Sequence, residues 1–479
     1  MENIINKLKI DTNNLGDIVY RYKYINRQKI CIIYNEPLVS SDKISDFIIR
    51  SLDYIDNKYN NKIDLIPVIK NDINNFKVTE ITTYEDIVFY LHNGFTILLI
   101  DRNDTYLAFE TKRDLARGIS TPMTETTVRG ANDAFVEDIQ TNIGLIKRRI
   151  KSNNLWSNEI FIGRETKTKV SILYMNNICD KKLVKEVEKQ LKSIDIDGII
   201  SSGTIKNLIE KETKSIFPTI NTSERPDRAC DALLEGKIVI VTDTSSFVLI
   251  LPNNINDYFK SVEDNYGKNI NISFIRIIRY ISFFITLLTP GVYIAITTYN
   301  QEMLPTELLI SFASQRSLVP FPAFFEAILM ILAFQILRES DLRIPNVSSS
   351  ALSIVGALIL GEAAVNAGIV SPIMIIVVAI TTISSLLFTE PEVTYALRIY
   401  RILFMIGGAL MGITGVIFVF IFLVIKLSSL ESFGKPFLIP FAPTYKSELK
   451  DSIIKTPVKD ETKRASYLTS NTTKLRRNT

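Results

Sequence analysis

The stretch YISFFITLLTPGVYIAITTY, residues 280–299, contains no charged side chain. A helix of about twenty apolar residues is long enough to cross the roughly 30 Å hydrocarbon core of a bilayer. Pro290 and Gly291 interrupt its middle, where a proline leaves a backbone carbonyl without a partner. Lipid offers that carbonyl no donor, so neighbouring protein must supply one. The stretch therefore predicts one helix of an all-α, polytopic membrane domain.

Three further apolar blocks follow this segment. Residues 318–337 predict a second span, residues 351–388 are long enough for two helices, and residues 402–425 predict a last span. The last span opens with GGALMGITG, whose small residues allow close helix contact. Glycines interrupt the first part of the 351–388 block, and irregular backbone is tolerated at membrane depth only beside protein or water. We predict four full crossings, with the glycine-rich stretch only partly inserted.

The basic residues predict the orientation. Arg276 and Arg279 immediately precede the first span, whereas the loop after it carries Glu302 and Glu307 before its only basic residue, Arg316. The tail after residue 434 is strongly basic. Because basic loops tend to remain in the cytoplasm, we expect both termini to be cytoplasmic.

Several polar and charged side chains lie inside the apolar half. Glu326, Glu362 and Asn366 fall within its blocks, and Arg398 and Arg401 fit poorly with four crossings. A charge at the bilayer centre costs roughly 2.5–3.5 kcal/mol, so it is usually paired, protonated or turned towards water. One interpretation is an ion path that contains Glu326, Glu362 and Asn366. The other is a set of structural hydrogen bonds between helices or near the interface.

The first half of the chain, rich in Asn, Asp, Lys and Ile, predicts a soluble α/β or α+β region. Short β-branched runs predict strands at 29–34, 96–101, 105–110, 159–164, 169–175, 237–241 and 247–251. Helical periodicity predicts helices at 41–52, 181–193 and 204–213. We expect two cytoplasmic α/β subdomains, residues 1–155 and 156–272, then a transmembrane domain at 273–430 and a basic tail at 431–479 with a disordered end.

The clearest helix of this half is predicted at residues 131–150, where apolar residues form one stripe. Glu137 and Asp138 are adjacent in its early part. Adjacent helix positions point in different directions, so we interpret these two acids as capping and surface residues rather than a catalytic pair. A second helix is predicted to start at Pro226 and to stop at Gly236.

The composition argues against several classes of function. The net charge is only +4, and no stripe of Lys and Arg with interleaved aromatics suggests nucleic-acid binding. His92 is the only histidine, which excludes a histidine-based triad or a histidine-rich metal site. The three cysteines lack a CxxC pair, and no phosphate-binding glycine loop follows a strand. We therefore expect no enzyme, no metal and no cofactor.

Long, non-repetitive stretches of the chain resemble one known family. They are TETTVRGANDAFVEDIQTNIGLIKRRI (124–150), SERPDRACDALLEGKIVIVTD (223–243), LTPGVYIAITTYNQEMLPTELLISFASQR (288–316) with the following FPAFFEAILM, and GKPFLIPFAP (434–443). In this order they resemble the GerA-type A-subunit family of spore germination proteins. The resemblance covers nearly all of the apolar half and much of the soluble half.

The resemblance implies an A subunit of a germinant receptor in the inner membrane of bacterial spores, which helps to trigger germination in response to nutrients. It also implies a permease-like B subunit and a lipoprotein C subunit as partners, and a homo-oligomer that forms a nutrient-gated ion channel. A non-conducting scaffold that transmits a signal is an alternative, and so is the paralogous branch that acts with the spore dipicolinate channel. Within the shared strings, the candidates for packing between domains or subunits are Arg129, Gly130, Glu137, Asp138, Arg225, Asp227 and Arg228.

Overall fold

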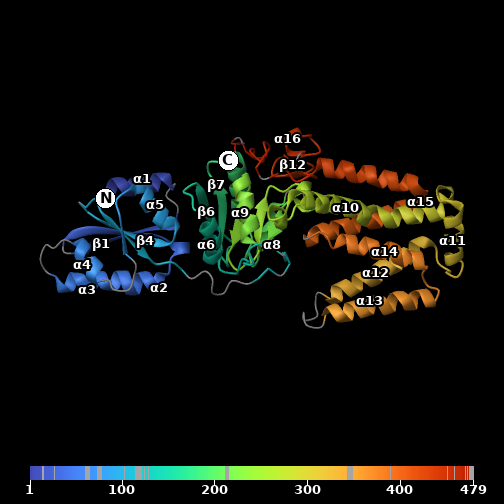
Figure 1. Cartoon of the computed structure of the whole chain (residues 1–479), viewed down its shortest axis with the longest axis horizontal. Helices are drawn as coiled ribbons and strands as arrows, with labels where there is room; N and C mark the ends of the chain where they lie inside the picture. The colour runs from blue at the N-terminus through green and yellow to red at the C-terminus, as the bar shows by residue number, and fades with distance from the viewer. Residues whose placement is uncertain are drawn as a thin grey trace.

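A computed structural model describes residues 1–473 except 13–15, 26, 60–64, 73–77, 102, 114–120, 123, 128, 211–214, 342–348, 389, 450, 458, 470 and 472. Two sheets with their helices and then a bundle of long helices follow one another along the longest axis of the molecule (Figure 1). The chain passes through them in sequence order and returns with its tail to the second sheet.

The first sheet consists of β1 (Ile18–Ile25), β2 (Gln28–Asn35), β3 (Val78–Ile81), β4 (Phe95–Ile100) and β5 (Tyr106–Glu110). Its strand order is β1-β2-β4-β5-β3, and all neighbouring strands are antiparallel. Helices α1 (Glu2–Asp11) and α5 (Tyr84–His92) cover one face, and α3 (Arg50–Lys58) and α4 (Leu65–Asp72) cover the other. Because both faces are covered, every residue of the apolar run FTILLI in β4 is buried.

The second sheet repeats this topology. Strands β6 (Leu155–Ile162), β7 (Thr168–Met175), β8 (Asn221–Ser223), β9 (Ile238–Thr242) and β10 (Val248–Leu251) are ordered β6-β7-β9-β10-β8, which matches the first sheet strand for strand. Helices α6 (Ile139–Arg149) and α9 (Pro226–Glu235) cover one face, while α7 (Lys181–Lys192) and α8 (Ser202–Ile209) cover the other. The soluble half therefore contains two α/β subdomains of one design, with antiparallel sheets.

The predicted helix at 131–150 is shorter than expected. It begins at Ile139, because the Asp138 carboxylate accepts the backbone N–H of Thr141 at 2.8 Å and caps the first turn. Residues 131–137 form neither helix nor strand. Helix α6 itself packs on the second sheet, although the sequence boundary at 155 assigned it to the first subdomain. The division by packing therefore falls before α6.

A buried ion pair joins the two subdomains. Lys147 of α6 donates to the carboxylate of Asp17 at 2.6 Å and to Asn35 at 3.3 Å, and both Lys147 and Asp17 are almost fully buried. His92, the last residue of α5, is also buried and makes a hydrogen bond with Asn153. These contacts hold α6 against the edge of the first subdomain.

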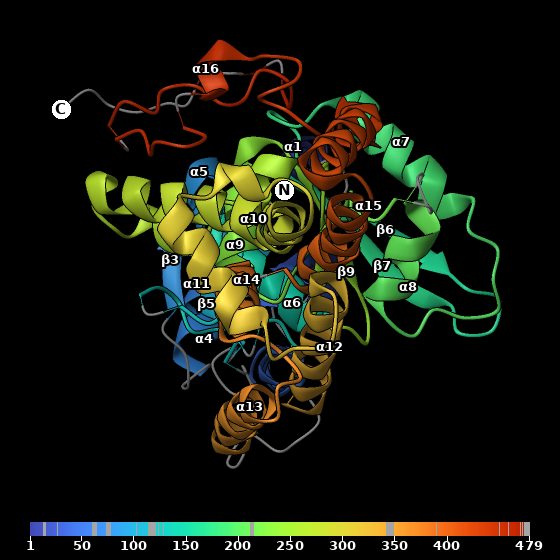
Figure 2. The same cartoon turned by 90° about the vertical axis from the view of Figure 1, so that its right-hand side faces the viewer.

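The second half consists of α10 (Asn269–Thr298), α11 (Thr306–Arg316), α12 (Ala323–Asp341), α13 (Ser349–Asn366), α14 (Pro372–Ser385) and α15 (Pro391–Ser429). Viewed along the long axis, α10 lies among the other helices and α13 lies at the edge of the bundle (Figure 2). Among the described residues, two helical stretches are long and apolar enough to cross a membrane by length and composition, Asn269–Thr298 and Glu392–Ser429.

Helix α10 continues through Pro290 instead of breaking there. The neighbouring Gly291 is a point of close helix contact, since a Cβ atom at this position would lie 2.7 Å from the carbonyl oxygen of Phe404 in α15. At the position of the predicted interruption, α10 therefore stays helical and packs closely against α15. In the same way, α13 includes Gly356 and Gly361 without a break and ends at Asn366, so the glycine-rich stretch forms a helix of 18 residues.

Helix α15 reverses direction at Gly412, whose φ of 63° and ψ of −144° are not helical. The two legs, residues 391–411 and 413–429, lie against each other so closely that a Cβ atom on Gly407 would be 2.9 Å from the carbonyl oxygen of Gly415. Asn300, after α10, holds the turn by accepting the N–H of Ile413 at 3.1 Å. The prediction of one last span at 402–425 is therefore wrong, because the chain turns back in its middle.

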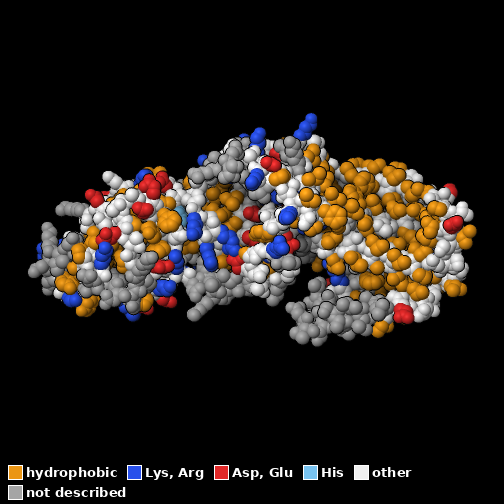
Figure 3. Space-filling view, viewed as in Figure 1, with side chains coloured by type: hydrophobic (Ala, Val, Ile, Leu, Met, Phe, Trp, Pro, Cys, Tyr) orange, Lys and Arg blue, Asp and Glu red, His pale blue; other side chains and the backbone are white. Residues whose placement is uncertain are grey.

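Hydrophobic side chains gather over the surface of the helical half, whereas charged side chains are spread over the two sheets (Figure 3). Leu332, Ile336, Leu410, Phe418 and Ile425 are among the exposed apolar residues. Folded proteins rarely expose an apolar surface of this extent to water, so we expect lipid or another protein to cover it.

Candidate functional site at the junction of the two halves

The segment that links the two sheets is held by Glu224, in the turn between β8 and α9. One carboxylate oxygen of Glu224 accepts the backbone N–H of Thr124 at 2.6 Å, the Thr124 hydroxyl at 2.8 Å and the N–H of Glu125 at 2.9 Å. The backbone carbonyl of Glu224 accepts the N–H of Phe135 at 2.8 Å. The segment is therefore fixed at both ends to one turn of the second subdomain.

Arg225, the next residue, is 1 % exposed and uses its guanidinium to hold the same segment. It donates to the backbone carbonyls of Glu125 at 3.0 Å and Ala131 at 2.9 Å, and to the carboxylate of Asp227 at 2.7 Å. The backbone of Gly130 packs closely against the Arg225 side chain, because a Cβ atom on Gly130 would be 3.4 Å from the guanidinium. The buried charge of Arg225 thus has an acidic partner and carbonyl acceptors, as a buried cation requires.

Arg228, the third residue of α9, connects the second sheet to the helical half. Its guanidinium pairs with the carboxylate of Glu125 and lies 3.2 Å from that of Glu390, the residue before α15. Ser223 donates to Glu125 at 2.6 Å, and Thr222 donates to Glu390 at 3.2 Å. The linking segment, the β8–α9 turn and the start of α15 therefore meet at one guanidinium.

A second pair of contacts supports this junction. Lys206 of α8 is buried and pairs with Glu392 in the first turn of α15. Further along α15, the ring of Tyr400 stacks on Phe217 of the soluble half, with ring centroids 5.4 Å apart. The first leg of α15 is thus held by charge at its start and by an aromatic contact beyond it.

The junction contains more negative than positive charge, because Glu125 and Glu390 share Arg228. Glu390 is 5 % exposed, and burial raises the pKa of its carboxyl to about 7; Arg228 opposes this rise and Glu125 reinforces it. Burial by itself lowers the pKa of Arg228, but the two carboxylates more than offset that effect and raise it. Glu390 is therefore the group at the junction whose charge changes near neutral pH.

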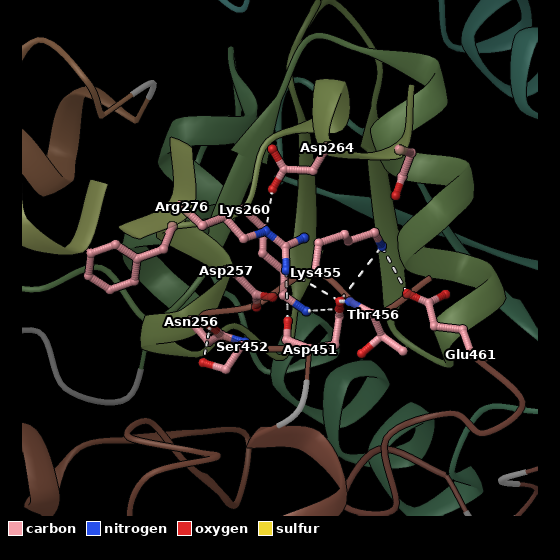
Figure 4. A network of polar contacts seen from close by, with 12 residues as sticks. Asn256, Asp257, Lys260, Asp264, Arg276, Asp451, Ser452, Lys455, Thr456 and Glu461 are labelled. Atoms are coloured by element: carbon pink, nitrogen blue, oxygen red, sulfur yellow. Dashed lines mark hydrogen bonds and ion pairs between the residues drawn. The ribbon is translucent and has the colours of Figure 1, made fainter. Parts of the chain in front are cut away.

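The base of α10 is tied to the tail by another charged network (Figure 4). Asp264 accepts from Arg276 at 2.6 Å and from Arg279 at 3.0 Å. Asp451, in the tail, lies 3.3 Å from Arg276 and 2.9 Å from Lys260. Burial raises the pKa of Asp451, but the surrounding cations more than offset it and bring the pKa to about 2.

The three residues of the predicted ion path do not lie together in one chain. Glu326 is buried near the start of α12, where it accepts the N–H and the hydroxyl of Ser371 at 3.0 and 2.9 Å and lies 3.4 Å from Arg316. Glu362 and Asn366 are exposed, one helical turn apart on α13. The contacts of Glu326 are those of a structural residue at a helix start, whereas the other two form a polar face.

The sequence matches the family model described as Bacillus/Clostridium GerA spore germination protein over residues 6–467. The chain belongs to the GerA family. It is 40% identical over 458 residues to spore germination protein KA of Bacillus subtilis, which covers 95% of this chain and 84% of the relative. It is 36% identical to spore germination protein B1 of the same organism, over 95% of both chains. Spore germination protein GerLA of Bacillus cereus is 32% identical, over 94% of this chain and 91% of the relative.

A solved structure also matches part of this GerA chain. It is the N-terminal domain of the A subunit of the Bacillus megaterium spore germinant receptor GerK3, at 34% sequence identity. The match covers 52% of this chain and 92% of that domain, with a TM-score of 0.41.

Four of the seven motif residues predicted in the GerA strings lie at the junction: Gly130, Arg225, Asp227 and Arg228. The other three lie elsewhere. Asp138 caps α6 and contacts Arg113 at 3.4 Å, and Glu137 is exposed, with its backbone carbonyl accepting the N–H of Thr244 at 2.8 Å. Arg129 is exposed and makes no hydrogen bond or ion pair with the residues that the structure describes; its neighbour Val128 lies outside them.

Sequence reasoning missed Glu125 and Glu390, the two acids of the junction. Glu125 belongs to the TETTVRG string but carries no pattern of its own. Glu390 could have been singled out from the sequence, because it is the first residue of the acidic string EPE that follows an apolar block. Acidic residues at an edge expected to be basic are a reason to look for a buried cation partner.

Proposed function

We propose that this GerA chain is the A subunit of a spore germinant receptor, embedded in the inner spore membrane. It acts with a permease-like B subunit and a lipoprotein C subunit, without enzymatic activity, metal or cofactor. Its role is to convert a change in the soluble half into a change in the helical half, where several copies form an ion path. The observation that carries this proposal is the Arg228 guanidinium, which contacts Glu125 and Glu390 at once.

Placement in a membrane is supported by the apolar surface of the helical half and by its long helices. Counting α10, α12, α13, α14 and the two legs of α15 as crossings gives six, two more than expected from the sequence. Both numbers are even and leave both termini on the cytoplasmic side. Six crossings also bring Arg398 and Arg401 near the cytoplasmic end of a helix, where basic residues are favoured.

The coupling between the halves is supported by the burial of the junction. A movement of the β8–α9 turn displaces Arg228, and Glu390 must follow or remain as a buried carboxylate without its counter-charge. Leaving a buried charge unpaired costs roughly 3–5 kcal/mol, which is enough to make α15 follow the turn. The junction is thus suited to transmit a conformational signal to the helices.

The ion path is supported by the exposed pair Glu362 and Asn366 on α13, in a half whose surface is mostly apolar. A polar face at membrane depth is stable against protein or water rather than lipid. In a ring of identical subunits, these faces can surround a common aqueous space. A scaffold that does not conduct is the alternative, and the number of copies in the assembly separates the two.

Cation flux through the purified receptor in liposomes tests this function. Glu362→Gln and Asn366→Ala are expected to reduce flux several-fold, and the matched control Glu307→Gln removes an exposed acid from α11 without effect. Unchanged flux in both α13 variants would remove these residues from the path. A monomeric subunit in mild detergent that gives no flux above empty liposomes would favour the scaffold.

A further inference from the structure

The helical half contains a recess lined by three arginines. Arg338 near the end of α12 and Arg398 and Arg401 on the first leg of α15 line it, together with Thr286 of α10 and Thr394 of α15. The recess has an empty volume of about 350 Å³, including its open mouth. Its lining includes neither the charged residues of the Arg228 junction nor Glu362 and Asn366 of α13.

Three polar groups of this recess lack a hydrogen-bond partner among the described residues. Arg401 is 7 % exposed, and its Nε atom is buried without a hydrogen-bond acceptor among the described residues. The hydroxyls of Thr286 and Thr394 are buried in the same recess and are likewise unpaired within the described part of the chain. Three such groups around one space are uncommon, because nearly all buried polar atoms are hydrogen-bonded.

The charge of the recess is also uncompensated. Within the residues that the structure describes, no carboxylate lies at ion-pair distance from Arg398 or Arg401. Arg398 lies over the ring of Tyr395, 5.1 Å from its centroid, and the exposed Glu339 acts on it from outside the recess. Among the described residues, the charges that act on Arg401 are the like charges of Arg398 and Arg338. Burying the charge of Arg401 beside like charges without an anion is strongly unfavourable.

We propose that this recess binds a phosphate group. A guanidinium presents its N–H groups in a planar fork that matches two phosphate oxygens, and threonine hydroxyls can donate to a third. Arg398 and Arg401 lie roughly 10–15 Å along α15 from its start at the soluble half. If the helices cross a membrane as proposed above, this is the depth of the cytoplasmic headgroups, where basic pockets between helices take anionic lipids. The phosphate site itself does not depend on that placement.

Binding to the purified full-length chain in detergent tests the site. The probes are dioctanoyl phosphatidylglycerol, dioctanoyl phosphatidylcholine and inorganic phosphate, each titrated while Trp156 fluorescence reports thermal unfolding. We expect saturable stabilisation by an anionic probe and an affinity about tenfold or more weaker in the Arg398→Gln/Arg401→Gln variant. Lys426→Gln removes one exposed positive charge from the second leg of α15 and is expected to bind as the wild type does.

The probes separate the two sources of phosphate. Saturation by phosphatidylglycerol at concentrations where inorganic phosphate has no effect identifies a lipid headgroup, and the opposite result identifies a soluble anion. Should the double variant fail to fold, Arg401→Lys and Thr394→Val each remove donors while keeping the charge or the shape, and both are expected to weaken binding. Absence of binding by every probe, or equal binding by all folded variants, would overturn the proposal.

Discussion

At the scale of single residues, Arg228 is the contact on which the junction depends. It is the cation between two buried carboxylates, Glu125 and Glu390, that come from segments far apart in the sequence. Its removal therefore affects both the linking segment and the start of α15.

We predict that Arg228→Met destabilises the chain by roughly 3 kcal/mol, because it leaves two buried carboxylates without a counter-charge. Unfolding in detergent can be followed through Trp156, the single tryptophan, which lies in β6. Arg148→Met is the matched control, since Arg148 is an exposed arginine on α6. Equal stability of the two variants would show that the Arg228 contacts contribute little.

Glu390 makes stability depend on pH. Its folded pKa of about 7 lies above the usual 4.5, so the folded state favours the protonated carboxyl. The resulting stabilisation is fully present below about pH 4.5 and is lost as pH rises through about 7, a change of up to roughly 3 kcal/mol. Glu390→Gln should remove this part of the dependence. Parallel curves of unfolding free energy against pH for the two proteins would contradict this assignment.

The sequence allowed part of this site to be predicted. Arg225, Asp227 and Arg228 stand in one conspicuous string, and the structure places all three at the junction. Their partners were not predictable, because Glu125 and Glu390 are separated from them by about 100 and 162 positions. Such pairs become visible only once the chain is folded.

At the scale of elements, the turn at Gly412 decides how α15 packs. Small residues at Gly407 and Gly415 let the two legs approach until their backbones touch. The GGALMGITG string was recognised as a site of close contact, but between different helices. Its apolar periodicity continues through the turn, so periodicity alone predicts one straight helix.

We predict that Gly415→Ala destabilises the helical half by about 2 kcal/mol or more, because its Cβ would overlap the carbonyl of Gly407. Gly361→Ala in α13 is the control, since the nearest atom to its Cβ would be 3.8 Å away on Ile375. Thermal unfolding in detergent measures both. A Gly415→Ala variant as stable as Gly361→Ala would exclude the tight hairpin.

The strands of the soluble half show where sequence patterns suffice. All seven predicted runs overlap strands, although five extend one or two residues beyond them. Six of the strands, all except the edge strand β6, are covered on both faces and are almost continuously buried. The missed strands lack such apolar runs. β1 is an edge strand with exposed Arg21 and Tyr22, and β3 and β8 have only four and three residues.

At the scale of the whole molecule, the two sheets share one strand order and lie in a row with the helical half. The tail closes this arrangement by returning from α15 to the second subdomain, where Ser432 donates to the carbonyl of Thr219 at 2.6 Å. The second subdomain therefore contacts the linking segment, the helices and the tail. In the function proposed above, a signal from the first subdomain to the helices passes through this second subdomain.

The central claim is that the helices cross a membrane while both sheets and the tail lie on one side of it. It is tested by maleimide labelling in right-side-out vesicles, after the three buried cysteines have been replaced by alanine. Single cysteines are placed at the exposed positions Glu165, Glu302 and Lys463. The account predicts that an impermeant maleimide labels position 302 in intact vesicles and positions 165 and 463 only after permeabilisation. Labelling of all three positions in intact vesicles, or protection of position 302, would contradict it.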